Sequence, residues 1–255
     1  MNAQAKVAQL SIAKQSINIK EIGLFIGIPL LLMALLLIFE PVSIDLWIAD
    51  HLYISGTGFI GKKSFFLEDI LHDRVKQVLY VVPILALVGL LASYCKLSFI
   101  PAWLKNHRRD MAYVLLAMGI SIGVITPLKR ETAVQCPWSL SRYGGVEQYS
   151  SLMSPRPPAI KNAGLCWPGG HASAGFSFLA FFFLFRDKNA ARAKKALIFA
   201  LTLGSVLAFG RMLQGAHFLS HNVWTVLIDW TVCATTYFLL LAPHAVKSSA
   251  PSRRS

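Results

Sequence analysis

Six apolar runs, separated by charged or polar stretches, set the strongest constraint on how this chain can fold. They cover about residues 22–39, 78–94, 111–128, 172–185, 196–209 and 223–242. Apolar runs of about this length suit helices that cross the hydrocarbon core of a bilayer. The sequence therefore predicts an all-α polytopic membrane protein. Its membrane domain would be a six-transmembrane-helix bundle over residues 22–242, between an N-terminal segment 1–21 and a tail 243–255.

The composition supports a membrane protein over other classes. Of 255 residues, 55% are hydrophobic and only 15% are charged, too few for the polar surface of a soluble domain of this length. The net charge of +13 could attract nucleic acid, but no basic stripe is interleaved with aromatics, which argues against nucleic-acid binding. A cleaved signal peptide is the alternative for the first run. No small-residue cleavage pattern follows Phe39-Glu40-Pro41, so an uncleaved span is favoured.

The connection between the first two runs, residues 40–76, is polar and mixed. Within it, apolar and charged residues from Phe65 to Arg74 alternate at helical spacing. This pattern predicts a short outer amphipathic helix, lying on the membrane or packing over the bundle. Its carboxylates could be metal ligands, but a solvated helix face is the commoner meaning of such a pattern.

The distribution of basic residues predicts the orientation of the bundle. Six spans place both termini on one side, and the short loops 96–110 and 186–195 on that side are rich in Lys and Arg. By the positive-inside rule, both termini are then cytoplasmic. The loops that carry Lys129, His171 and Arg211 would face the outside or periplasm.

Two of these outer stretches have residues suited to phosphate chemistry. The turn Cys166-Trp167-Pro168-Gly169-Gly170-His171 ends where an apolar helix is expected. Its glycines let the backbone approach an anion at a helix N-terminus, and His171 could transfer a proton. Farther on, Arg211 precedes His217 by six residues, and His221 follows four later. A guanidinium could hold phosphate oxygens while a neutral imidazole attacks phosphorus.

These stretches carry a resemblance to a known family. Pro-Gly-Gly-His at 168–171 resembles the Pro-Ser-Gly-His motif of the type 2 phosphatidic acid phosphatase superfamily. Arg211-x5-His217 resembles its Ser-Arg-x5-His-x3-Asp motif, and Lys129 resembles the Lys of its Lys-x6-Arg-Pro motif. The resemblance covers about residues 111–230, with the three motifs in the family's order.

The resemblance implies a membrane enzyme of the bacterial inner membrane that hydrolyses lipid phosphates or diphosphates without a metal or other cofactor. His217 would form a phosphohistidine, and His171 would protonate the leaving oxygen. The side chains of Lys129 and Arg211 would hold the phosphate, assisted by the backbone N–H groups of Gly169 and Gly170. Implied substrates in the outer leaflet are lipid A, undecaprenyl diphosphate, phosphatidylglycerophosphate and phosphatidic acid.

The sequence departs from the family pattern at three positions. Cys136-Pro137 stands where the first motif has Arg-Pro, so Arg130 or Arg142 would have to supply the guanidinium. Arg142 is favoured because it lies in a turn able to fold back. Gly169 replaces a serine. His221 replaces the aspartate that would orient the attacking imidazole, and its role stays open between catalytic and structural.

Cys136 and Cys166 lie in one outer loop, which would face an oxidising compartment. We predict a disulfide between them, which would tie the Lys129 segment to the Pro-Gly-Gly-His turn and contribute about 3–4 kcal/mol. A metal site made of the three histidines is disfavoured, because the nearby Lys and Arg would repel the cation. Two other functions remain open: a phosphotransferase acting between envelope lipids, and a non-catalytic lipid-binding or transport protein on the same scaffold.

Overall fold

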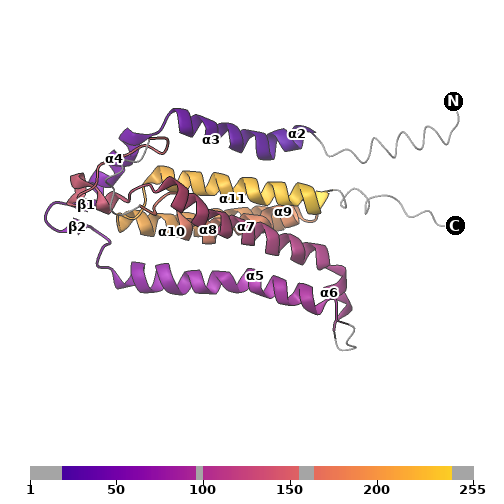
Figure 1. Ribbon diagram of the computed structural model, residues 1–255. Coiled ribbons are helices and arrows are strands. Elements are labelled where there is room, and N and C mark those ends of the chain that lie inside the picture. The colour runs from indigo at the N-terminus through magenta and orange to yellow at the C-terminus, as the bar shows by residue number, and fades with distance from the viewer. Residues whose placement is uncertain (1–18, 96–99, 155–163, 243–255) are drawn as a thin grey trace, which may run out of the picture.

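The computed structural model describes residues 19–95, 100–154 and 164–242, which form a bundle of long helices (Figure 1). The predicted tail and nearly all of the predicted N-terminal segment lie outside these residues. In chain order, the elements are α2 (Ile19–Ile22), η1 (Gly23–Gly27), α3 (Ile28–Ile38), α4 (Val42–His51), β1 (Tyr53–Ile54), β2 (Gly58–Phe59), η2 (Phe66–Arg74), α5 (Val75–Ala92), α6 (Ala102–Asn106), α7 (Arg108–Thr132), η3 (Pro137–Ser139), η4 (Ser141–Tyr143), α8 (Gly170–Phe176), α9 (Leu179–Arg186), α10 (Ala190–Leu213) and α11 (Leu219–Leu240).

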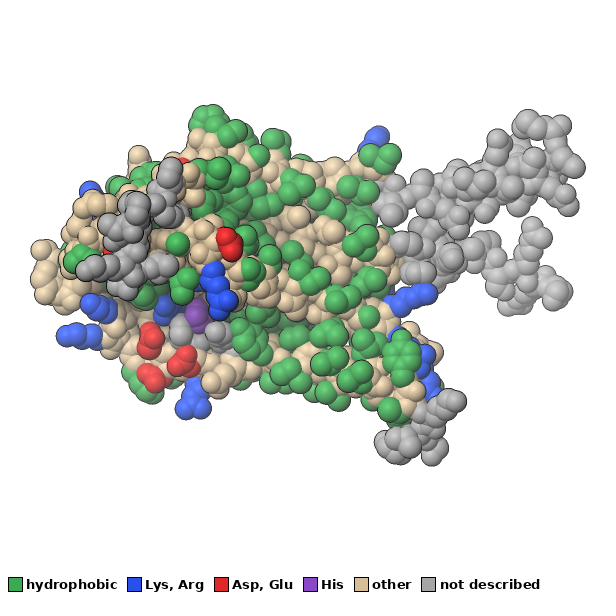
Figure 2. Space-filling view, in the orientation of Figure 1, with side chains coloured by type: hydrophobic (Ala, Val, Ile, Leu, Met, Phe, Trp, Pro, Cys, Tyr) green, Lys and Arg blue, Asp and Glu red, His purple; other side chains and the backbone are tan. Residues whose placement is uncertain are grey.

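Several of these helices are suited to a bilayer. Within the described residues, four segments are long and apolar enough to cross a membrane, and a fifth apolar helix, Gln77–Ala92, is shorter. The four are Ile19–Ile38, Arg108–Ser139, Ala190–Leu213 and Leu219–Leu240. Figure 2 shows hydrophobic side chains spread over the middle of the bundle, with charged ones gathered toward its two ends. This distribution indicates a membrane protein, because lipid-facing side chains must be apolar.

The expected fourth span, residues 172–185, is formed by two shorter helices. α8 and α9 meet at residues 177–178 and together lie in the interior of the bundle. Their small and aromatic residues pack against α7, α10 and α11 around fully buried side chains, including Tyr113, Met118, Leu179 and Phe183. A Cβ added to Gly175 of α8 would lie 2.6 Å from the Cα of Gly204 in α10. These two helices therefore touch backbone to backbone.

One end of the bundle is covered by residues 40–76, where the sequence predicted a polar connection with one helix. The structure adds α4 and a short hairpin in which Tyr53 pairs with Phe59. Gly56 and Gly58 have φ angles of 77° and 101°, the left-handed conformation that glycine adopts without steric cost. Phe59 and Tyr143 pack in a second small core with Phe218, at the start of α11.

The predicted amphipathic helix is present as η2, but it continues directly into α5 instead of standing apart. Its apolar side faces α10: a Cβ added to Gly210 would lie 2.7 Å from a methyl carbon of Leu71. The helix thus packs over the bundle. Its polar side carries Glu68 to the end of α10, a contact that matters for the candidate site.

Candidate active site

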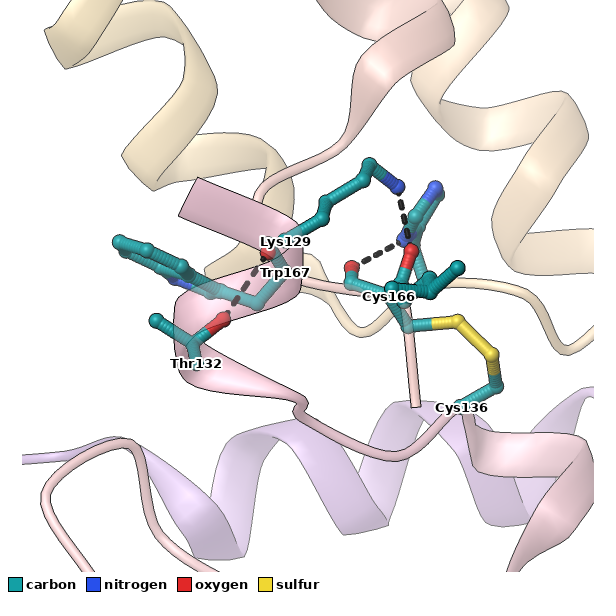
Figure 3. The surroundings of a disulfide bond; sticks show 7 residues. Lys129, Thr132, Cys136, Cys166 and Trp167 are labelled. Carbon is teal, nitrogen blue, oxygen red and sulfur yellow. Dashed lines mark hydrogen bonds between the residues drawn. A yellow bond between two sulfur atoms is a disulfide. The ribbon is translucent and has the colours of Figure 1, made fainter. Parts of the chain in front are cut away.

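The first part of the site is the end of α7. The helix stops at Thr132, and Ala133 adopts a left-handed conformation with φ of 47°. Lys129, in the last turn, donates from its Nζ to the carbonyl oxygen of Leu165 at 2.6 Å. Thr132 Oγ1 donates to the carbonyl oxygen of Trp167 at 3.3 Å (Figure 3). One face of this turn therefore holds the chain segment that leads into the Pro-Gly-Gly-His turn.

The predicted disulfide between Cys136 and Cys166 is confirmed (Figure 3). Its Cα atoms are 5.2 Å apart, and both cysteines are buried. The N–H of Cys166 also donates to the carbonyl oxygen of Val134 at 3.1 Å. The bond joins the segment after Lys129 to the segment before the glycine turn, as the sequence indicated.

The glycine turn lies next to Lys129. A Cβ added to Gly170 would lie 3.5 Å from the Cε and 3.9 Å from the Nζ of Lys129. His171 follows Gly170 in the first turn of α8. The N–H of Gly169 donates to Thr225 Oγ1 at 2.8 Å, so this amide would have to leave Thr225 to bind a phosphate.

His217 contacts the disulfide-linked segment. It is 5% exposed, and its Nδ1 is 2.6 Å from the carbonyl oxygen of Cys166. Burial lowers the pKa of His217 well below its usual range, and the nearby charges of Lys129, His221 and Arg211 lower this pKa further. The imidazole is therefore neutral at neutral pH, the form that can attack phosphorus.

His221 is the second histidine of this stretch. α11 begins at Leu219, so His221 lies within this helix but His217 precedes it. The rings of His217 and His221 nevertheless lie close, with centroids 6.0 Å apart. His221 is buried, and its Nδ1 has no hydrogen-bond partner among the residues that the structure describes.

Arg211, in the last turn of α10, has partners that the sequence did not reveal. Its Nη1 donates to Gln214 Oε1 at 2.8 Å and lies 3.5 Å from Glu68 Oε2. Gln214 Nε2 donates to the same Glu68 oxygen at 2.6 Å. The guanidinium of Arg211 also lies over the ring of Trp138, 5.6 Å from the ring centroid. A phosphate at Arg211 would compete with Glu68.

Arg142 lies at the same end of the bundle but contacts α4. Its Nε and Nη2 donate to the two carboxylate oxygens of Asp50 at 2.8 and 2.6 Å. Tyr143 OH donates to Asp50 at 3.0 Å. The pair connects the turn around residue 142 to α4. A role for Arg142 in phosphate binding stays a prediction.

The described residues include no group of three or more His, Cys, Asp or Glu side chains placed to hold a metal ion. The arrangement is instead one of cations and imidazoles. Lys129 and Arg211 both act electrostatically on His217, and the segment 165–167 connects Lys129 with His217 through hydrogen bonds. Such a site can hold an anion and offer it a neutral nucleophile.

The fold and this end of the bundle together define a helical membrane protein that gathers cationic and imidazole side chains at its helix ends. A sequence profile of the PAP2 superfamily matches residues 110–242, just over half of the chain and nearly all of α7 through α11. The chain belongs to the PAP2 superfamily. Members of this superfamily are generally phosphatases, so membership indicates a phosphatase-type activity. No curated protein and no solved structure gives a significant match to the chain.

Proposed function

We propose that the protein is an integral membrane phosphatase that hydrolyses a lipid-linked phosphate or diphosphate through a phosphohistidine intermediate. The observation that carries this proposal is the state of His217. Its ring is buried, its Nδ1 contacts the carbonyl oxygen of Cys166, and burial, followed by the charges of Lys129 and Arg211, lowers its pKa. A neutral imidazole beside fixed cations suits nucleophilic attack on a phosphate.

The reaction has two steps. In the first, His217 Nε2 attacks phosphorus, the bond from phosphorus to the lipid oxygen breaks, and His171 gives that oxygen its proton. In the second, water attacks the phosphohistidine while His171 takes the proton of the water, and inorganic phosphate leaves. Lys129 and Arg211 hold the non-reacting oxygens in both steps.

The proposed orientation follows from the charges of the loops. We place six spans in the bacterial inner membrane with both termini in the cytoplasm, so that the site opens to the periplasm. A lipid of the outer leaflet could then present its headgroup to the helix ends while its acyl chains stay in the bilayer. Lipid A, undecaprenyl diphosphate, phosphatidylglycerophosphate and phosphatidic acid are the substrate candidates.

The test is phosphate release by the purified protein in detergent, measured on a panel of these four lipids with and without chelator. We expect chelator to have no effect and His217→Ala and His171→Ala to abolish release. His107→Ala is the matched control, because His107 lies in the connection between α6 and α7, outside the site. Undiminished release by His217→Ala or His171→Ala would refute the assigned roles.

Two further measurements separate this proposal from its alternatives. With substrate labelled on the phosphate, a phosphohistidine leaves label on the protein that is stable in alkali and lost in acid. Label that moves to an added acceptor lipid instead of to water would identify a phosphotransferase. Lipid binding without turnover on any member of the panel would identify a non-catalytic protein.

A further inference from the structure

The chain lacks a carboxylate at the position where the aspartate of the resembled motif would orient the nucleophile. His221 occupies this position, and a neutral imidazole has no full negative charge to offer. Its Nδ1 has no hydrogen-bond partner within the described residues, and its ring centroid is 6.0 Å from that of His217. Another group must then hold the ring of His217.

The carbonyl oxygen of Cys166 is placed to do this. It lies 2.6 Å from His217 Nδ1, slightly shorter than the usual N–H···O hydrogen bond of about 2.7–3.2 Å. A carbonyl oxygen can only accept, so Nδ1 must carry the hydrogen and donate it. This contact selects one tautomer and leaves the lone pair of Nε2 available. An orienting acceptor on the other ring nitrogen is the role that a carboxylate has in related arrangements.

The position of this carbonyl is fixed by its neighbours on both sides. Two consecutive carbonyl oxygens each receive a side-chain donor, Leu165 from Lys129 and Cys166 from His217. The next one, of Trp167, lies 3.3 Å from Thr132 Oγ1, whose single hydrogen is shared with the nearer carbonyl oxygen of Leu128 at 2.7 Å. The N–H of Cys166 is bound by the carbonyl of Val134.

The disulfide adds a covalent link at Cys166 itself. The side chain of Cys166 is bonded to Cys136, a few residues beyond the end of α7 (Figure 3). The acceptor is therefore attached to the same helix end that presents Lys129. Without the disulfide, no covalent cross-link would hold the carbonyl in position against His217.

We propose that the carbonyl of Cys166, held by the Cys136–Cys166 disulfide, orients His217 in place of the missing carboxylate. Cys166 is then a positioning residue, and the disulfide is required for the full rate. The inference rests on the proposed role of His217 as nucleophile. Reduction would free the carbonyl to move, so that His217 would sample other ring orientations and the second tautomer.

Turnover tests the proposal first. The double variant Cys136→Ser/Cys166→Ser should lose roughly 10- to 100-fold in kcat, by analogy with the loss of a group that orients a metal-bound histidine. The matched control is Cys95→Ser, which removes an exposed free cysteine elsewhere. Reduction of the wild-type protein should cause the same loss, and reoxidation should restore the rate. A folded double variant, or a reduced wild-type protein, with unchanged kcat would overturn the proposal.

A rescue experiment separates orientation from general loosening of the loop. His221→Asp supplies a carboxylate at the position where the motif expects one. If orientation is what is lost, this change should raise kcat several-fold more in the Cys136→Ser/Cys166→Ser background than in the disulfide-bonded protein. A merely structural role of the disulfide predicts no such difference, and equal effects in both backgrounds would contradict the proposal.

A spectroscopic readout does not depend on turnover. In ¹⁵N-histidine spectra of the oxidised protein, assigned with His217→Ala, His217 should be in the Nδ1–H tautomer. After reduction, the signal should show exchange with the other tautomer. An Nε2–H tautomer in the oxidised protein would refute the orienting contact. If the spectra show the Nδ1–H tautomer but His217→Ala keeps phosphatase activity, the proposed role of His217 as nucleophile is wrong, while the contact with the carbonyl of Cys166 is confirmed.

Discussion

The carboxylate of Asp45 in α4 accepts hydrogen bonds from both the backbone N–H and the hydroxyl of Ser220, at the first turn of α11. The N–H bond is 2.9 Å long, and Asp45 is 1% exposed. The side chain that caps the start of a helix usually belongs to a residue next to that helix in the sequence. Here the cap is Asp45, 175 residues before Ser220. Since Ser220 lies between His217 and His221, Asp45 fixes where this stretch enters the bundle.

Asp45 makes the stability of the protein depend on pH. Burial raises its pKa from 3.8 to about 6, although the bonds from Ser220 lower this pKa in part. A raised pKa means that the folded protein binds the proton more tightly, so stability should fall as pH rises from about 4 to about 6, by on the order of 2–3 kcal/mol. Asp45→Asn should remove this dependence. The unfolding free energy of the variant minus that of the wild type should therefore be larger at pH 7 than at pH 4.5.

Asp50→Asn is the control whose effect should be nearly the same at pH 4.5 and pH 7, because both values lie above the ordinary aspartate pKa of 3.8. The hydrogen bond from Arg142 lowers the pKa of Asp50, so its contribution to stability is present above the ordinary pKa of an aspartate and is lost in acid. Denaturant unfolding in detergent at the two pH values measures both variants. If Asp45→Asn shifts stability equally at pH 4.5 and pH 7, Asp45 does not titrate in this range.

Glu68 should weaken phosphate binding by competing for Arg211. The two side chains lie 3.5 Å apart, and Gln214 bridges them. Because Glu68 is largely exposed, the pair is worth at most about 1 kcal/mol, and Glu68→Gln should tighten inhibition by inorganic phosphate or vanadate roughly two- to fivefold. Asp69→Asn, which makes the same charge change on the same helix, should have a smaller effect. Weaker inhibition in Glu68→Gln would show that the carboxylate supports the site.

Arg142 can be tested through its partner. The bidentate contact with Asp50 favours a structural role, in which Arg142→Ala and Asp50→Ala lower Tm similarly and the double variant is no worse than either. KM should then change less than about twofold. A role in phosphate binding, which the sequence suggested, predicts a KM increase of about tenfold or more for Arg142→Ala alone, the loss of roughly one charge-assisted hydrogen bond. Steady-state kinetics and thermal unfolding of the three variants decide between these roles.

The orientation can be tested with cysteines at the two ends of the bundle. Cys95 is exposed beyond the end of α5, and Val146, in the loop before α8, is 86% exposed. In intact cells, a membrane-impermeant maleimide should label Val146→Cys in a Cys95→Ser background, whereas the native Cys95 should react only after permeabilisation. Labelling of Cys95 in intact cells would show that the topology is the reverse of the proposed one.

The apolar runs predicted the long helices well, because length and hydrophobicity are local properties of the sequence. The first, third, fifth and sixth runs correspond to the four segments that are long and apolar enough to cross a membrane. The disulfide could be predicted because the topology placed both cysteines in one loop. α4 was missed, since the short stretch Val42–His51 mixes apolar and acidic residues and has no long periodic pattern.

The site was only partly predictable, because much of it depends on contacts between distant residues. His171, Arg211 and His217 could be chosen by residue type and spacing, and Lys129 by its resemblance to the first motif of the family. Nothing in the sequence pairs Glu68 with Arg211 or Asp45 with Ser220, since 143 and 175 residues separate these partners. The acceptor of His217 is a backbone carbonyl, which every residue carries and which therefore leaves no mark in a sequence.

The contact between Gly175 and Gly204 links the interior of the bundle to the chemistry at its end. α8 begins with the turn that holds His171, and α10 ends with the turn that holds Arg211. The crossing point of these helices therefore sets how far apart His171, the proposed proton donor, and the guanidinium of Arg211 can lie. A single methyl group added at residue 175, remote from any reacting atom, would push the two backbones apart and misalign both ends at once.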